Sequence, residues 1–199
     1  MQPALWAAIL IPLVLLLWLV AQVMPTPRDR QLNRLRAHAR GLGLAVHVRR
    51  VPDPDPEPEA RVSGGGAARD PRLEVAVYTR PLRLPAGIER RHVPAFRALA
   101  MPRHADETLV PGLPAGWRLE RSELPLLDPV LAELGALLLR TPRGTVTVEG
   151  TASGCSVAWR ERGETGEVDA LGAVLDDLCA IELALARKAA AREAARGAD

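Results

Sequence analysis

Four side chains of catalytic types lie scattered along the middle of the chain: His92, His104, Asp106 and Cys155. Imidazole, carboxylate and thiol groups act as general acids, bases and nucleophiles when a fold holds them within hydrogen-bonding reach. No local motif joins them, and Gly154-Cys155-Ser156-Val157-Ala158 lacks the second glycine of a nucleophile elbow. A membrane-tethered enzyme with a site assembled from these residues is one hypothesis, but the sequence assigns no catalytic residue.

Three short segments have the composition of ligand-binding motifs in the wrong context. Gly41-Leu42-Gly43 closes a predicted helix and precedes a strand, whereas a dinucleotide fingerprint follows a strand and opens a helix. Ser63-Gly64-Gly65-Gly66 lacks the Gly-Lys-Ser/Thr ending of a phosphate loop. His104-Ala105-Asp106-Glu107 groups three ligand types, but zinc and calcium need more ligands at defined spacings. The sequence therefore predicts no cofactor and no metal.

Arginine dominates the positive charge, because Lys188 is the only lysine. Residues 25–104 contain 16 arginines and 8 acidic residues, whereas residues 105–199 are acidic overall. Guanidinium groups bind phosphate and carboxylate, although a solvated arginine-rich surface is the alternative. Nucleic acid is not expected, because Phe96 is the only aromatic residue between Arg80 and Arg103. The candidate contacts with lipid or an acidic partner are Arg28, Arg30, Arg34, Arg36, Arg40, Arg80, Arg83, Arg90 and Arg91.

The first two dozen residues predict a membrane anchor. Residues 3–24 carry no charged side chain, and a helix of that length rises about 33 Å, enough for a hydrocarbon core of about 30 Å. Pro12 interrupts the run, which transmembrane helices tolerate. A cleaved signal peptide is the alternative, but no charge precedes the run and no small-residue cleavage pattern follows it. We therefore predict a retained transmembrane helix.

The flanking charges predict the direction of this anchor. Five arginines from Arg28 to Arg40 follow the span and are opposed only by Asp29, so the positive-inside rule places them in the cytoplasm. We expect a single-pass protein of the cytoplasmic (inner) membrane with a short N-terminus outside and the C-terminal domain inside. Cys155 and Cys179 fit a reducing compartment as small core residues, and a reversed topology would allow them one bridge.

The remaining chain mixes helical and strand periodicities, which predicts an α+β fold. Helices are expected at residues 27–40, 128–139 and about 167–187. Alternating patterns predict strands at residues 44–49, 72–78, 117–120, 145–149 and 155–160. Residues 80–115 show no steady period. The expected architecture is an N-terminal transmembrane helix followed by a small antiparallel sheet with helices packed on one face.

Composition divides this architecture into five segments. Alternating proline and acidic residues followed by glycines predict an extended loop or linker at residues 51–71, inserted after the first strand. The predicted segments are a transmembrane anchor (3–24), a basic juxtamembrane helix and first strand (25–50), that linker (51–71), an α+β soluble domain (72–187) and an Ala/Arg-rich tail (188–199).

Three stretches carry a resemblance: Pro25-Thr26-Pro27-Arg28, residues 32–46 and residues 157–164. With its short apolar N-terminus, the chain resembles uncharacterised bacterial single-pass membrane-anchored proteins. Its layout is also similar to that of the small single-span accessory subunits of secretion machinery. The resemblance implies no activity and no functional residue. We expect an accessory or scaffold protein that contacts the bilayer and another membrane protein; a tethered enzyme and an anionic-lipid-responsive regulator are the alternatives.

Overall fold

The structure is a computed structural model that describes residues 10–16, 18, 26–62, 64–123 and 128–196. It divides into two compact units, residues 1–34 and residues 35–199. Helix α2 (Pro27–Gly41) contains the boundary between them. The unit that holds the sheet begins at Leu35.

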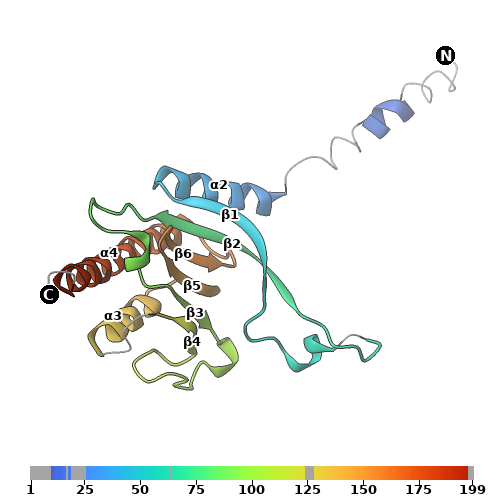
Figure 1. Cartoon of the computed structure of the whole chain (residues 1–199). Coiled ribbons are helices and arrows are strands. Elements are labelled where there is room, and N and C mark those ends of the chain that lie inside the picture. Colours follow the sequence, from blue (N-terminus) through green and yellow to red (C-terminus); the bar gives the residue numbers. More distant parts are fainter. Residues whose placement is uncertain (1–9, 17, 19–25, 63, 124–127, 197–199) are drawn as a thin grey trace, which may run out of the picture. The chain divides into compact units, whose positions relative to one another are not determined.

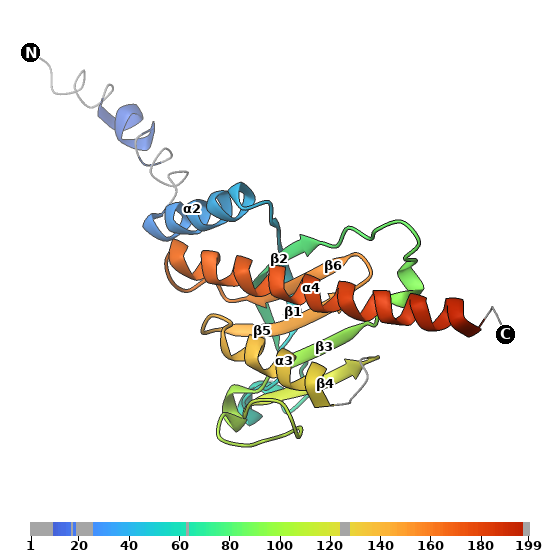
Figure 2. The same ribbon diagram turned by 90° about the vertical axis from the view of Figure 1, so that its left-hand side faces the viewer.

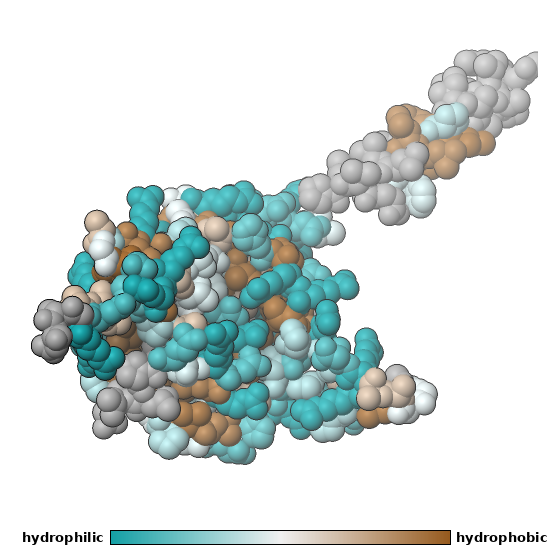
Figure 3. All heavy atoms as spheres, viewed as in Figure 1, coloured by the Kyte–Doolittle hydropathy of each residue, from teal (hydrophilic) through white to brown (hydrophobic). Residues whose placement is uncertain are grey.

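The first unit contains part of the predicted anchor. Residues 10–16 and 18 are helical, and their large apolar side chains are exposed, as the brown spheres of this segment in Figure 3 show. The rest of the predicted span at residues 3–24 lies outside the described residues. Within the described parts of the chain, no helix combines the length and the apolar character needed to cross a membrane.

Helix α2 starts at a reciprocal capping interaction. The backbone N–H of Asp29 donates to Thr26 Oγ1 (3.1 Å), and the backbone N–H of Thr26 donates to the Asp29 carboxylate (3.0 Å). Such pairs occupy amide groups that a helix N-terminus leaves without a partner. After the helix, Gly43 takes a φ of +75°, a conformation that costs glycine little. The chain there turns into the first strand.

The second unit is built on a six-stranded sheet in the order β1-β2-β6-β5-β3-β4 (Figure 1). All neighbouring strands are antiparallel. The predicted α+β fold with an antiparallel sheet is confirmed. The strands are β1 (Ala45–Pro52), β2 (Arg72–Pro81), β3 (Phe96–Ala100), β4 (Trp117–Ser122), β5 (Thr145–Thr151) and β6 (Gly154–Trp159).

Helix α4 (Thr165–Arg196) lies across one face of the sheet and packs beside α3 (Asp128–Leu139), as Figure 2 shows. Its buried side chains recur every three or four residues, so one face of the helix closes the core. They include Val168, Leu171, Leu175, Leu178 and Leu185. The helix continues past residue 187 through the Ala/Arg-rich segment, because alanine, arginine and glutamate are strong helix formers.

Two rings form the centre of the core under α4. Tyr78 on β2 and Trp159 on β6 are fully buried, and their ring centroids lie 5.9 Å apart. Neighbouring residues along a strand point to opposite faces, so Val77 and Ala158 point away from α4. They form a second apolar cluster with Val51, Val75 and Val146. The sheet therefore buries side chains on both faces.

The segment predicted as a linker connects two paired strands. Pro52 on β1 lies opposite Arg72 on β2, so the ladder runs to both ends of the connection. The connection contains the 3₁₀ turn η1 (Pro58–Arg61), and the Asp55 carboxylate accepts the backbone N–H of Arg103 (2.6 Å). Residues 53–71 thus connect two paired strands of the folded unit.

Residues 80–115 hold one strand that the sequence did not predict. β3 pairs with β4 on one side and β5 on the other, and it shifts register between Arg97 and Ala98. Two further 3₁₀ turns flank it, η2 (Arg90–His92) and η3 (Pro102–His104). A five-residue strand with an arginine at its second position and a register shift shows too little alternation to be recognised.

Candidate functional site

Two of the predicted ligand-binding arginines hold the fold together. Arg36 Nε donates to Glu161 Oε1 (2.8 Å), and Tyr78 Oη donates to the same oxygen (2.8 Å). The hydrogen bond to Glu161 raises the pKa of Arg36, and burial raises the pKa of Tyr78. Arg80 donates to the backbone oxygen of Leu42 (2.7 Å) and to Asp176. Arg36 and Arg80 are therefore occupied within the protein.

The other predicted arginines are exposed at the surface. Arg28, Arg30 and Arg34 belong to the first unit; the second unit has Arg40 at the end of α2 and Arg83, Arg90 and Arg91 between β2 and η2 or within η2. Arg91 contacts the carboxylates of Glu89 (3.3 Å) and Glu193 (3.0 Å). The seven exposed side chains remain accessible to lipid or to an acidic partner.

The four catalytic-type residues have separate environments. His92 Nε2 lies 2.6 Å from Glu193, while its Nδ1 accepts the backbone N–H of Glu89. His104 Nδ1 lies 3.0 Å from Glu107, and Asp106 is exposed. Cys155 is buried under α4. In the described parts of the chain no hydrogen bond or ion pair joins these four, and no group of three or more acidic, histidine or cysteine side chains could hold a metal.

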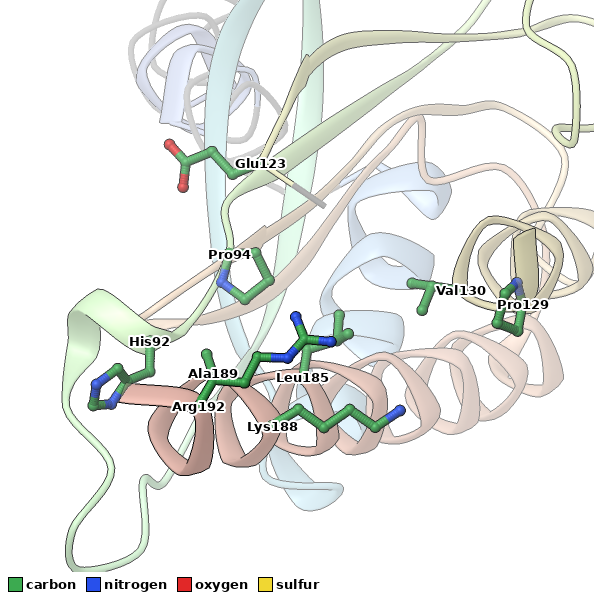
Figure 4. Close-up of a pocket in the computed structure, with 9 residues that line it drawn as sticks. All are labelled: His92, Pro94, Glu123, Pro129, Val130, Leu185, Lys188, Ala189 and Arg192. Carbon is green, nitrogen blue, oxygen red and sulfur yellow. The ribbon is translucent and has the colours of Figure 1, made fainter. Parts of the chain in front are cut away.

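The structure instead shows a groove between α3, α4 and the segments next to the start of β3 and the end of β4 (Figure 4). We name it the α3–α4 groove; its volume is about 430 Å³, within the range of small-molecule and peptide side-chain sites. Its lining residues are His92, Pro94, Glu123, Pro129, Val130, Leu185, Lys188, Ala189 and Arg192.

The floor of the groove is apolar and its rim is charged. Figure 4 shows Lys188 extending from α4 toward Pro129 and Val130 of α3. The rim carboxylate of Glu123 accepts hydrogen bonds from the backbone N–H of Ala95 (3.0 Å) and from Arg121, which lower its pKa.

Lys188 and Arg192 supply uncompensated positive charge at this rim. Both side chains are exposed, and within the described residues neither forms an ion pair. The nearby acids are committed elsewhere, since Glu193 contacts His92 and Glu123 contacts Arg121. An apolar floor beside two free cations fits a ligand that has an apolar body and negative groups.

The sequence contained a signal for this groove that was not used. Leu185, Lys188, Ala189 and Arg192 follow the spacing i, i+3, i+4, i+7, which places them on one face of a helix. The prediction assigned most of them to a tail beyond the last helix. The opposite wall comes from α3 and the β3–β4 edge, and no local pattern reveals that pairing.

The fold and the groove thus define an α+β domain with an amphipathic groove on its surface. Comparisons with protein-family models, with curated proteins and with solved structures find no match for this chain.

Proposed function

We propose that this chain is a membrane-anchored accessory protein whose α+β domain binds an acidic, partly apolar segment of another membrane protein. Residues 3–24 are the proposed anchor, and the arginines that follow place the domain at the cytoplasmic face of the membrane. The α3–α4 groove carries the proposal, because it combines apolar floor residues with Lys188 and Arg192, two cations that form no ion pair within the described residues.

Charge and shape both favour a peptide segment as the occupant. Burial of an apolar side chain on Leu185 and Val130 supplies affinity, roughly 25 cal/mol for each Å² removed from water. Carboxylates of the peptide beside that side chain would pair with Lys188 and Arg192. This attraction guides the peptide to the groove and fixes its orientation there. Catalysis is less well supported, because the histidine and the carboxylate at the groove are already engaged by protein groups.

The experiment is co-purification of the full-length protein from cross-linked membranes in mild detergent, followed by mass spectrometry. We expect a stoichiometric partner with the wild type. The double variant Lys188→Glu/Arg192→Glu should lose at least tenfold in affinity for it, about 1.4 kcal/mol, because two attractions become repulsions.

The matched control is Arg61→Glu/Arg69→Glu, which changes net charge equally at two exposed positions outside the groove. It should retain the partner. Equal retention by both double variants would refute the groove as the binding site, and a wild type that purifies alone would refute the accessory function.

The arginines of α2 favour a second candidate, a regulator that responds to anionic lipid. Arg28, Arg30, Arg34 and Arg40 are all exposed, and each basic residue near an anionic surface contributes about 1 kcal/mol. Binding to vesicles that contain anionic lipid should then weaken steeply as salt rises, since surface charge is screened. Salt-independent binding would count against this candidate.

A further inference from the structure

Two thiols meet under α4, at a place separate from the α3–α4 groove. Cys155 on β6 is fully buried and Cys179 on α4 is 8% exposed; both are free cysteines. The two thiol groups are close enough that each shifts the pKa of the other. Cys179 Sγ also lies 3.8 Å from the backbone oxygen of Arg80, and Arg80 is the cross-strand neighbour of Cys155. The Cys179 thiol on the helix thus lies beside the Arg80–Cys155 pair of the sheet beneath it.

We propose that Cys155 and Cys179 are a thiol-exchange site that forms a reversible disulfide with a low-molecular-weight disulfide as oxidant. The inference goes beyond the proposed binding function, since it does not involve the groove or the identity of any partner. Simple core packing is the competing explanation for two buried cysteines.

The surroundings distinguish the two sulfurs. Interaction with the Cys155 thiol and backbone N–H lowers the pKa of Cys179, and the Arg80 guanidinium acts in the same direction. Burial and Asp176 act in the opposite direction. Interaction with the Cys179 thiol, together with burial, raises the pKa of Cys155, and Glu182 adds to that rise. Because the thiolate is the nucleophile, Cys179 reacts first.

The exchange balances in two steps. The Cys179 thiolate attacks one sulfur of the oxidant RSSR, which forms a Cys179–S–SR mixed disulfide and releases RS⁻. The Cys155 thiol then loses its proton to a released RS⁻, and its sulfur attacks Cys179 Sγ and expels the second RS⁻. Two protein thiols are oxidised, one RSSR is reduced, and the two thiol protons leave on two RSH molecules. A reducing thiol reverses the sequence.

The bridge would join α4 to β6 covalently. The chain between the two cysteines includes the start of α4, so the bond closes a loop and restricts the unfolded state. In a reducing compartment such a bond is transient, and in an oxidising one it persists. The site therefore responds to redox conditions on whichever side of the membrane the domain lies.

The test is incubation of the full-length protein in mild detergent with oxidised glutathione, followed by acid quenching, alkylation and peptide mass spectrometry. We expect the wild type to lose both alkylatable thiols together and to yield a linked pair of peptides. Cys155→Ser should stop at a glutathione adduct on Cys179. Cys179→Ser should stay unmodified, because Cys155 is inaccessible.

Measurements on the wild-type protein alone test the proposed site, so the test does not require the variants to fold. Two thiols that stay alkylatable after native oxidation, or a bridge between two chains instead of within one, would refute the site. A second readout is the pH profile of adduct formation in Cys155→Ala. If Arg80 and the Cys155 backbone N–H activate Cys179, the midpoint of this profile should lie at a lower pH in the folded variant than in the same variant unfolded in urea. Equal midpoints would refute that activation.

Discussion

Glu182 is the side chain with the least favourable environment among the residues described. It lies on the buried face of α4 with 1% of its surface exposed, and neither carboxyl oxygen has a hydrogen-bond partner in the described structure. A side chain at Gly150 would overlap both Glu182 and Phe96, so the carboxyl group lies directly against β5 and β3. Burial raises its pKa to about 8, and the neighbouring Cys179 adds to that rise.

This environment predicts a pH-dependent cost in stability. The pKa is about 8 in the folded protein against 4.5 for the ordinary group, so the unfolded chain ionises first as pH rises. Stability should fall from about pH 4.5 to pH 8 and change no further above that. Glu182→Gln should remove the loss and gain on the order of a few kcal/mol at pH 8.

Chemical denaturation of the wild type and of Glu182→Gln at pH 5 and pH 8 checks this prediction. The difference between them should be small at pH 5 and large at pH 8. Glu133→Gln, at an exposed position on α3, is the control and should show no such divergence. A wild type that is equally stable at both values would show that the carboxyl group gains a partner in solution.

At the scale of elements, one carboxylate links three segments that are distant in sequence. Glu161 follows β6 and accepts hydrogen bonds from Arg36 of α2 and Tyr78 of β2. The Glu161 side chain is 7% exposed and the Arg36 side chain is 24% exposed, so water has little access to this ion pair and competes weakly with it. The second part of α2 is thus held to the sheet by a charge-assisted pair as well as by the buried Leu35 and Ala39.

Glu161→Ala should destabilise the second unit by about 1–3 kcal/mol, because it leaves a buried tyrosine hydroxyl and a half-buried guanidinium without an acceptor. Thermal unfolding followed by near-ultraviolet circular dichroism measures the loss and reports on Tyr78 and Trp159 directly. Glu164→Ala, at an exposed position nearby, should be close to neutral. Equal effects from both substitutions would mean that the contacts of Glu161 with Arg36 and Tyr78 contribute nothing to stability.

At the scale of the whole molecule, the proposed function requires the chain to be attached to a membrane. The described apolar segment, residues 10–16 and 18, exposes its large side chains and forms part of the uncharged run at residues 3–24. Basic residues follow this run closely, which favours a cytoplasmic location for the sheet.

Removal of residues 1–24 should therefore release the protein from membranes, whereas the full chain should resist alkaline carbonate extraction. Protease added to the outside of intact cells should leave the C-terminal unit uncut, and permeabilised cells should lose it. Extraction of the full chain by carbonate would refute the anchor. Cleavage of the C-terminal unit in intact cells would show that the anchor has the opposite orientation.

Local periodicity by itself determined most of the elements. Alternation along residues 72–78 and 155–160, the glycine that closes α2 and the apolar stripe of α4 each depend on a few neighbouring residues, so a single sequence reveals them. The missing strand β3 is the exception, because its arginine and register shift break the alternation. The uncharged run at residues 3–24 and the arginines after it are likewise sequence properties, and the anchor that they predict remains a prediction.

Only the tertiary structure decided which of these residues act together. The sequence grouped Arg36 and Arg80 with the other arginines, yet Glu161 lies 125 residues from Arg36 and Asp176 lies 96 residues from Arg80. The contact between Cys155 and Cys179 depends on the angle at which α4 crosses β6, and the groove depends on α3 lying beside α4. Strand order, register and helix placement create these contacts, and no short-range pattern encodes them, because each depends on how distant segments bury their apolar faces together.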